Sequence, residues 1–421
     1  MQKSQLQRSY GIAGDIRERP GRKKESLLID WCALVQEVRE DNFERALAYA
    51  VENVSDNLEK FTEKFPSSGG VNGEYQPVNN ADTYLSSDWT SSFWTGMIWL
   101  AYDLTGEEKY KRAGLKQSKS FRKRYEENEI LTHHDIGFLY TLSCVAAYKK
   151  TGDVLSRETA VLAARKLLEQ YTDKCGSLQQ WGSPVDSENK KLGICIIDGC
   201  MNLPLLYWAA QMTGEKEFYD KAASHICNAA NYMLRDNGAV HQNLKFDVDT
   251  GKLLDAYTSQ GDGASDGCWS RGQAWAVYGF VLSYVYTGDK RLLELSKICA
   301  NYFLNRLQSD LCANWDFRYR KDSDQRDTSA VSITACGLLE LAKQLPVTDP
   351  DHAIYNAAAR VLISSLTENY LYTKPESSNA LLKAGVYAFR TGLCVNEPVI
   401  WGDYYYMEAL VRLLRPHRIF W

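Results

Sequence analysis

Residues 99–110 read WLAYDLTGEEKY, and variants of this sequence recur along the chain. They stand at 145–153 (VAAYKKTGD), 206–219 (LYWAAQMTGEKEFY) and 282–293 (LSYVYTGDKRLL). A weaker copy, LLELAKQLP at 338–346, lacks the Thr-Gly pair. The four pairs begin at Thr105, Thr151, Thr213 and Thr287, with spacings of 46, 62 and 74 residues.

Each copy predicts a helical hairpin. An apolar helix ends at Gly, which supplies a left-handed C-cap, and an acid opens the next helix, whose dipole favours a negative charge there. The first helix of each pair is apolar nearly all round, as in residues 274–286, so it is buried on most sides. Five or six such hairpins fit between residues 41 and 414.

The irregular spacing distinguishes two ways of stacking these hairpins. An open solenoid keeps a stricter period than 46 to 74 residues. Unequal loops gathered at one end of a closed ring fit better, because such loops carry function. We therefore expect an all-α fold, an α/α toroid of six hairpins with one funnel-shaped active-site end. Turn residues at 249–251 (DTG) predict one short β-hairpin within residues 239–257.

Composition excludes several classes of protein. The 421 residues carry 49 Lys and Arg against 53 Asp and Glu, a net charge of −4, which argues against nucleic-acid binding. The longest apolar stretch is too short to span a membrane. Eleven cysteines without a C-x-x-C pair indicate free thiols in a reducing compartment, and neither a metal nor an organic cofactor is expected. With no apolar segment after the basic N-terminus, we expect a cytoplasmic protein.

The domain prediction is simple. Residues 1–25 are polar and Gly-containing, and we expect a flexible tail there. Residues 26–421 are expected to form a single toroidal catalytic domain. The sequence carries no signal for the oligomeric state.

Polar groups interrupt the starts of four apolar helices. These segments are 88–94 (DWTSSFW), 133–138 (HHDIGF), 196–202 (IIDGCMN) and 269–275 (WSRGQAW). In a toroid such helix starts converge on the mouth of the funnel. The sequence thereby predicts a site at that end.

Two aspartates stand out among them. Asp198 follows Ile-Cys-Ile-Ile, and partial desolvation there would raise its pKa and suit a general acid. Asp135 would be the second carboxylate of a glycosidase pair. For both, the alternative is a helix N-cap. His133 and His134 are adjacent, so they do not share a helix face for a metal.

Arg271 and several aromatic residues are candidates for ligand binding. Arg271 offers a planar fork for a carboxylate, with a buried structural ion pair as the alternative. Trp269 and Trp275 can stack on a sugar. Trp89 and Trp181 sit in polar loop contexts and, taken singly, fit packing as well as binding. The sequence has no Walker A loop, no Rossmann glycine fingerprint and no G-x-S-x-G elbow.

These motifs, together with WGDYYYMEAL at 401–410, resemble those of the unsaturated glucuronyl hydrolases of glycoside hydrolase family 88. The resemblance covers residues 41–414 and implies an α/α toroid. It also implies removal of a terminal Δ4,5-unsaturated uronic acid from oligosaccharides made by polysaccharide lyases, through hydration of the C4=C5 bond. Asp198 would protonate C4 and activate water toward C5, while Asp135 would stabilise the developing positive charge. The resemblance further implies a substrate site built from Trp89, His134, Trp181, His241, Gln260, Arg271, Trp275 and Arg390.

One segment departs from part of the family. Members that prefer sulfated units carry Ser-x-x-Ser-x-Lys where residues 385–390 read GVYAFR, and a basic residue where Ser259 stands. Only Arg390 could still meet a sulfate, so we expect unsulfated substrates to be preferred.

Three other functions compete. An unsaturated rhamnogalacturonyl hydrolase would read R-G-N-G-W where this chain has R-G-Q-A-W at 271–275. A non-catalytic helical-repeat binder would have no need for Asp135, Asp198 and Arg271 at helix starts. An epimerase or isomerase on the same scaffold would use paired histidines, and only His133 and His134 hint at that.

Overall fold

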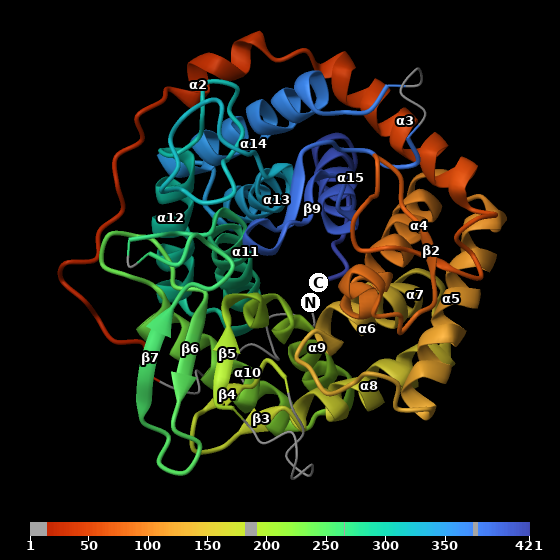
Figure 1. The fold of residues 1–421 in the computed structure, drawn as a ribbon, viewed down its shortest axis with the longest axis horizontal. Helices are drawn as coiled ribbons and strands as arrows, with labels where there is room; N and C mark the ends of the chain where they lie inside the picture. The colour runs from red at the N-terminus through yellow and green to blue at the C-terminus, as the bar shows by residue number, and fades with distance from the viewer. Residues whose placement is uncertain (1–14, 182–191, 265, 374–377) are drawn as a thin grey trace.

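The fold is a closed double ring of helices, seen end-on in Figure 1. It is a computed structural model that describes residues 15–181, 192–264, 266–373 and 378–421. Six inner positions of the described ring are occupied by α4 (Ser91–Thr105), the continuous run α6 (Ile136–Tyr140), η3 (Thr141–Val145) and α7 (Ala146–Thr151), then α9 (Leu203–Thr213), α11 (Ser270–Thr287), α13 (Thr328–Gln344) and α15 (Ile400–Leu414). The outer helices are α3 (Glu40–Asn57), α5 (Glu108–Glu126), α8 (Val154–Leu168), α10 (Lys216–Asn228), α12 (Lys290–Leu304) and α14 (Pro350–Asn369).

The inner helices close on themselves. Each contacts the next along the chain, and α15 returns to contact α4. The inner helices are buried around most of their circumference, as α11 is from Ser270 to Ser283, whereas outer helices such as α5 bury one face. The predicted α/α toroid is confirmed.

The recurring Thr-Gly pair makes the turn between an inner and an outer helix. The four glycines, Gly106, Gly152, Gly214 and Gly288, take left-handed φ values of 67°, 74°, 79° and 72°. At each turn the Thr hydroxyl donates to the carbonyl four residues earlier and accepts the N–H of the acid that opens the next helix. The threonine therefore links two helices, which explains why it recurs beside the glycine.

Thr287 offers a test of this link because it is buried. Its hydroxyl donates to the Ser283 carbonyl at 2.8 Å and accepts from the Asp289 N–H at 3.2 Å. We expect Thr287→Val to lower the free energy of unfolding by about 1–2 kcal/mol, because it leaves the Asp289 N–H without that acceptor. Thr287→Ser, which keeps the hydroxyl, is the matched control. Urea unfolding measures both, and equal losses would show that the hydroxyl is not what matters.

Short antiparallel strands lie in the loops between helices. The pairs are β1 (Phe65–Pro66) with β2 (Pro77–Val78), β3 (Tyr171–Thr172) with β4 (Ser177–Leu178), and β8 (Gly385–Ala388) with β9 (Leu393–Glu397). A three-stranded sheet has the order β5 (Ile194–Ile196), β6 (Asn243–Phe246) and β7 (Leu253–Tyr257). Its β6–β7 hairpin, which turns at residues 249–251, confirms the predicted one.

Short helices complete the described elements. They are α2 (Trp31–Leu34), η1 (Val35–Glu37), η2 (Tyr84–Trp89), η4 (Ile197–Met201), η5 (Ala229–Met233) and η7 (Phe389–Thr391). No helix in the described part of the chain combines the length and the apolar character that crossing a membrane requires.

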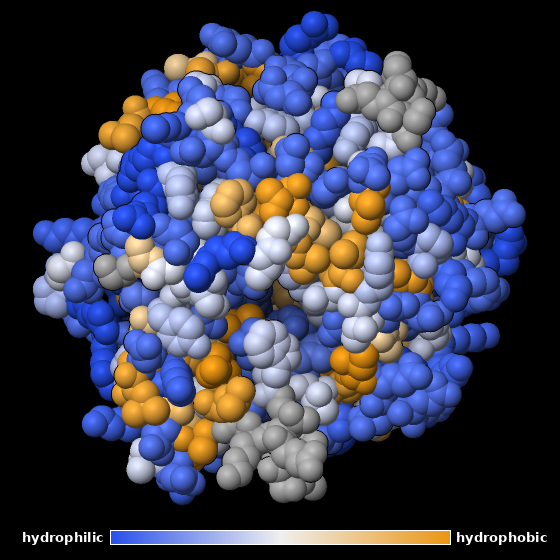
Figure 2. All heavy atoms as spheres, viewed as in Figure 1, coloured by the Kyte–Doolittle hydropathy of each residue, from blue (hydrophilic) through white to orange (hydrophobic). Residues whose placement is uncertain are grey.

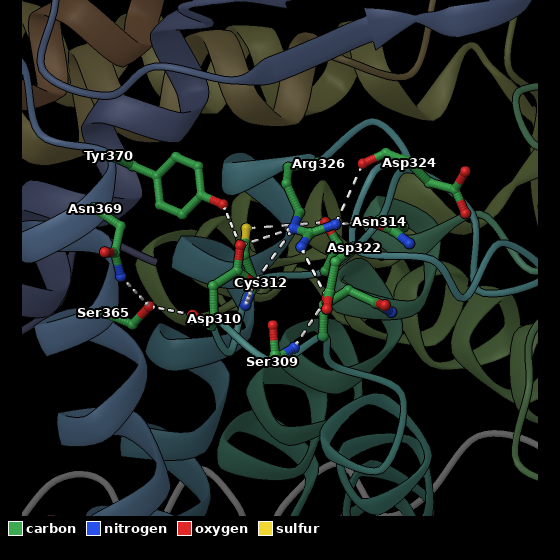
Figure 3. Close-up of polar contacts among 12 residues, drawn as sticks. Ser309, Asp310, Cys312, Asn314, Asp322, Asp324, Arg326, Ser365, Asn369 and Tyr370 are labelled. Atoms are coloured by element: carbon green, nitrogen blue, oxygen red, sulfur yellow. Dashed lines mark hydrogen bonds and ion pairs between the residues drawn. The ribbon is translucent and has the colours of Figure 1, made fainter.

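The long connection between α12 and α13 is held by a polar network (Figure 3). Asp310 pairs with Arg326 at 2.9 Å and accepts the Tyr370 hydroxyl at 2.6 Å. The connection carries Asp316, whose carboxylate accepts the backbone N–H groups of Asp262 and Cys268. Asp316 thereby ties this connection to the loop that leads into α11.

The predicted tail, residues 1–25, falls partly outside the described residues. Residues 15–25 run along the outside of the ring (Figure 1). Arg19 donates to the Asn231 carbonyl, Arg22 to that of Ala230, and Glu25 pairs with Arg306 at 2.9 Å. Arg19 and Arg22 thus donate to carbonyls of residues 230–234.

The last residue of the chain, Trp421, lies inside the ring (Figure 1). Its indole stacks on Tyr405, contacts Phe138 and donates to Glu408 at 2.9 Å. Most of the aromatic residues sit in such packed clusters.

Candidate active site

A pocket of about 190 Å³ opens at the end of the ring where the inner helices begin. Figure 2 shows the hollow near the middle of this face, with polar and apolar side chains around it. The pocket is lined by Ser86, Asp88, Trp89, Asp135, Gln180, Trp181, Ile196, Asp198, Gln242, Gln260, Trp269, Arg271 and Tyr387. All four interrupted helix starts contribute to it, as the sequence predicts.

Asp135 stands at the N-cap position of α6 but does not cap it with its side chain. Asn202, from the neighbouring η4–α9 junction, accepts the Phe138 N–H at 2.7 Å instead. The two segments approach so closely that a Cβ on Gly137 would lie 2.4 Å from the Asn202 Cα. Because Asn202 supplies the cap, the Asp135 carboxylate is free to make other contacts.

Two histidines adjoin that carboxylate. His133 Nδ1 lies 3.3 Å from one Asp135 oxygen, and His134 Nε2 lies 3.3 Å from the other. Burial by itself would raise the pKa of Asp135, but His134, His133 and Asn202 together hold it below the usual aspartate value. Asp135 is therefore an anion at neutral pH.

Asp198 has the opposite character. It lies in the first turn of η4, directly after β5, and is not an N-cap, a position that Ile196 holds for η4. Its Oδ1 is buried and makes no hydrogen bond within the described residues. Burial, and then the negative charge of Asp135, raise the pKa of Asp198 to about 7, although Arg271 opposes the shift. Asp198 can thus hold a proton near neutral pH.

Arg271 is clamped in the wall of the pocket. Its Nη1 lies 3.2 Å from Asp327 and also donates to the Val386 carbonyl, and its Nη2 donates to the Tyr387 carbonyl at 2.6 Å. The guanidinium lies over the ring of Trp269 at 4.5 Å. The buried ion pair, which the sequence left as an alternative, is present, and Arg271 lines the pocket as well.

The predicted site residues divide into two groups. Asp135, Asp198, Trp89, Trp181, Gln260 and Arg271 come together at the pocket, whereas His134, His241, Trp275 and Arg390 do not line it. His134 is buried beside Asp135, and His241 is half-buried next to Gln242. Trp275 is completely buried and packs on Phe138, and its indole lies near enough to Asp198 to lower the pKa of that carboxyl. Arg390 is exposed, beside Gly263.

Several lining residues escaped the sequence interpretation. Gln242 accepts the N–H groups of Ser259 and Gln260 at 2.9 and 2.7 Å and so shapes the loop that carries Gln260. Tyr387 accepts the indole N–H of Trp89 at 2.8 Å. Neither stands in a motif at a helix start. Gln242 directly precedes β6 and Tyr387 lies within β8, so neither carries a helix-start signal.

A carboxyl group that stays protonated beside an anionic carboxylate, in a polar pocket walled by tryptophans, defines the acid–base site of a glycoside hydrolase. The α/α toroid is a scaffold on which such a site can be built at one end of the ring. The chain belongs to glycosyl hydrolase family 88, whose family model matches residues 59–412.

Similar proteins agree with this assignment. The chain is 39% identical over 378 residues to an unsaturated chondroitin disaccharide hydrolase of Streptococcus pneumoniae, covering 90% of this chain and 93% of that protein. It superposes with a TM-score of 0.89 on the crystal structure of an unsaturated glucuronyl hydrolase from Streptococcus agalactiae, at 36% identity, covering 96% of this chain and all of the other. A mutant of the S. agalactiae enzyme, complexed with dGlcA-GalNAc6S, gives a TM-score of 0.83 at 34% identity, over 97% of this chain and all of the other.

Proposed function

We propose that this enzyme removes the terminal Δ4,5-unsaturated uronic acid from lyase-generated oligosaccharides of glycosaminoglycan type. The observation that carries the proposal is the pairing of Asp198, whose pKa burial raises to about 7, with the anionic Asp135 in one pocket. The related enzymes that act on unsaturated chondroitin or glucuronyl substrates support it.

The proposed reaction is the hydration of a vinyl ether. Asp198 donates its proton to C4, and the electrons of the C4=C5 bond move to form that C–H bond, which leaves positive charge at C5 and the ring oxygen. Asp135 stabilises that charge. The Asp198 carboxylate then takes a proton from a water molecule while the oxygen of that water bonds to C5. The resulting hemiketal opens spontaneously and the aglycone leaves.

The walls of the pocket suit a sugar. Trp89 and Trp181 offer aromatic faces, and Trp181 is 59% exposed. Gln260 and Arg271 offer N–H donors to hydroxyl or carboxylate oxygens. Eleven cysteines, none of them in a disulfide, support a cytoplasmic place of action.

The test is a panel of unsaturated chondroitin, hyaluronan and heparin disaccharides. We expect loss of the ultraviolet absorbance of the double bond, with release of the saturated sugar observed by mass spectrometry. Hydrolysis of an unsaturated rhamnogalacturonyl substrate alone would make the enzyme a member of that class instead. Binding without loss of the double bond would leave only a binding protein.

The residues at 385–390 and at 259 predict a preference for unsulfated substrates. Gly385 and Ala388 have no hydroxyl to offer a sulfate, and Ser259 uses its Oγ on Gln242 at 3.1 Å. Of these positions, only Arg390 could then pair with the charge of a sulfate that has lost its water. We expect kcat/KM for the unsulfated chondroitin disaccharide to exceed that for the 6-sulfated one by about fivefold, which corresponds to about 1 kcal/mol. Parallel initial rates at limiting substrate check this, and a preference for the sulfated disaccharide would reverse it.

A further inference from the structure

Gln180 is a polar residue of the pocket whose side chain the protein itself does not use. It lines the pocket beside Trp181 and is only 7% exposed. Its side-chain amide makes no hydrogen bond with the described residues, yet neither amide atom is closed off from solvent. Both backbone polar groups of Gln180 are bonded, so the group that it presents to the pocket is the amide.

The backbone of Gln180 is fixed to the two segments that carry the aspartates. Its N–H donates to the Ile194 carbonyl at 2.8 Å, and its carbonyl accepts the His134 N–H at 3.1 Å. Ile194 begins β5, which leads to Asp198, and His134 directly precedes Asp135. The position of Gln180 relative to both carboxylates is therefore set by the fold, as the recognition of one particular substituent requires.

The neighbouring Gln179 shows what an amide does when the protein uses it. Its Oε1 accepts the Gly193 N–H at 3.0 Å, and its Nε2 donates to the Trp181 carbonyl. Gln179 does not line the pocket. Of these two adjacent glutamines, the first holds the loop together and the second is available to a ligand.

Gln180 lies where the sugar next to the cleaved residue passes. The Oδ1 of Asp198 is buried, whereas Trp181 is 59% exposed and stands at the mouth of the pocket. The unsaturated residue has to reach Asp198, so the sugar attached to it extends toward Trp181. In unsaturated chondroitin and hyaluronan disaccharides that sugar is an N-acetylhexosamine joined through C3, and its acetamido group stands on the adjacent C2.

We propose that Gln180 selects the sugar next to the unsaturated uronic acid by pairing with its acetamido group. A glutamine amide offers an acceptor oxygen and N–H donors, and an acetamido group offers the matching N–H and carbonyl. A single hydroxyl at C2 cannot match both ends of the amide, and a buried polar group left without a partner is costly. This inference rests on the proposed function and specifies the aglycone for it.

The test compares the unsaturated hyaluronan disaccharide with the same disaccharide in which glucose replaces N-acetylglucosamine. We expect the wild type to favour the acetylated substrate by about 3- to 10-fold in kcat/KM, the worth of one neutral hydrogen bond. Gln180→Met, which keeps the length of the side chain but has no amide, should bring this ratio to about one. Because the ratio compares two substrates of one protein sample, a loss of folded enzyme cancels.

Gln179→Met is the matched control. It should lower both rates in proportion and keep the ratio, since Gln179 does not line the pocket. A wild type that treats both disaccharides alike would overturn the inference whether or not Gln180→Met folds, and so would an unchanged ratio in folded Gln180→Met. If no unsaturated disaccharide loses its double bond, the proposed function itself is wrong, and the inference falls with it.

Discussion

Asp198→Asn is expected to lower kcat/KM for an unsaturated disaccharide by at least about 10³-fold, because general acid–base catalysis contributes about 10²–10⁴ and Asp198 acts in two steps. Asparagine fills the same space but has no proton to give to C4 and no carboxylate to accept one from water. Initial rates of loss of the double-bond absorbance measure the effect. A variant that stays folded and retains a rate within tenfold of the wild type would show that another group is the acid.

The pH dependence of the wild-type enzyme gives a second readout of the same residue. Asp198 must be protonated to act, and its pKa is raised to about 7, so kcat/KM should fall as pH rises above that value. The unfolded chain loses this proton near pH 4, so the folded state becomes relatively less stable as pH rises from about 4 to 7. Asparagine has no such proton. At pH 8 Asp198→Asn should therefore raise the free energy of unfolding, by up to about 4 kcal/mol.

Asp403 provides the matched control for a raised pKa. Burial raises the pKa of Asp403 to about 7 as well, but its oxygens accept the N–H groups of Leu381 and Leu382 and the Tyr75 hydroxyl. It does not line the pocket. Asp403→Asn should cost stability through these lost acceptors and leave kcat of the folded enzyme close to that of the wild type. A raised pKa identifies a catalytic acid only where the carboxyl also faces the pocket.

The sequence predicts the ring because its signals are local. A glycine that ends a helix and an acid that starts the next act within a few residues, so the Thr-Gly copies locate four turns correctly. The apolar run before Asp198 likewise predicts that this residue is buried. For the turns and for the burial of Asp198, the residues that cause the feature are neighbours in the sequence.

The remaining parts of the site depend on contacts between distant segments. Asp135 stands where an N-cap is expected, and only the approach of Asn202, which lies 64 residues after the Phe138 N–H that it accepts, shows that the cap of this helix comes from elsewhere. Trp275 belongs to a pocket motif but is completely buried, since Phe138 and Tyr405 pack on it. Gln242 shapes the Gln260 loop because its side-chain oxygen accepts backbone N–H groups of that loop, a contact between segments that the sequence does not reveal.

The Arg271 side chain both stabilises the fold and lines the pocket. A double-mutant cycle with Asp327 separates these two roles. Both residues are buried, and the Asp327 carboxylate also caps α13 through the Ser329 N–H at 3.1 Å. Removing one partner leaves an uncompensated charge in the interior. We expect Arg271→Met to lower the free energy of unfolding by about 3–5 kcal/mol, with Asp327→Asn costing a similar amount.

The double variant Arg271→Met with Asp327→Asn should lose much less than the sum of the two single losses, because it leaves neither charge unpaired. Urea unfolding of the four proteins gives that coupling. Activity should not recover with stability: without the guanidinium the pocket lacks its cation, and kcat/KM should stay lower by about 10- to 100-fold, the worth of one hydrogen bond to a charged group. If activity returns together with stability in the double variant, Arg271 serves only to join α11, α13 and β8. If it does not, the clamp that holds Arg271 in the wall also orients its remaining N–H groups toward the substrate.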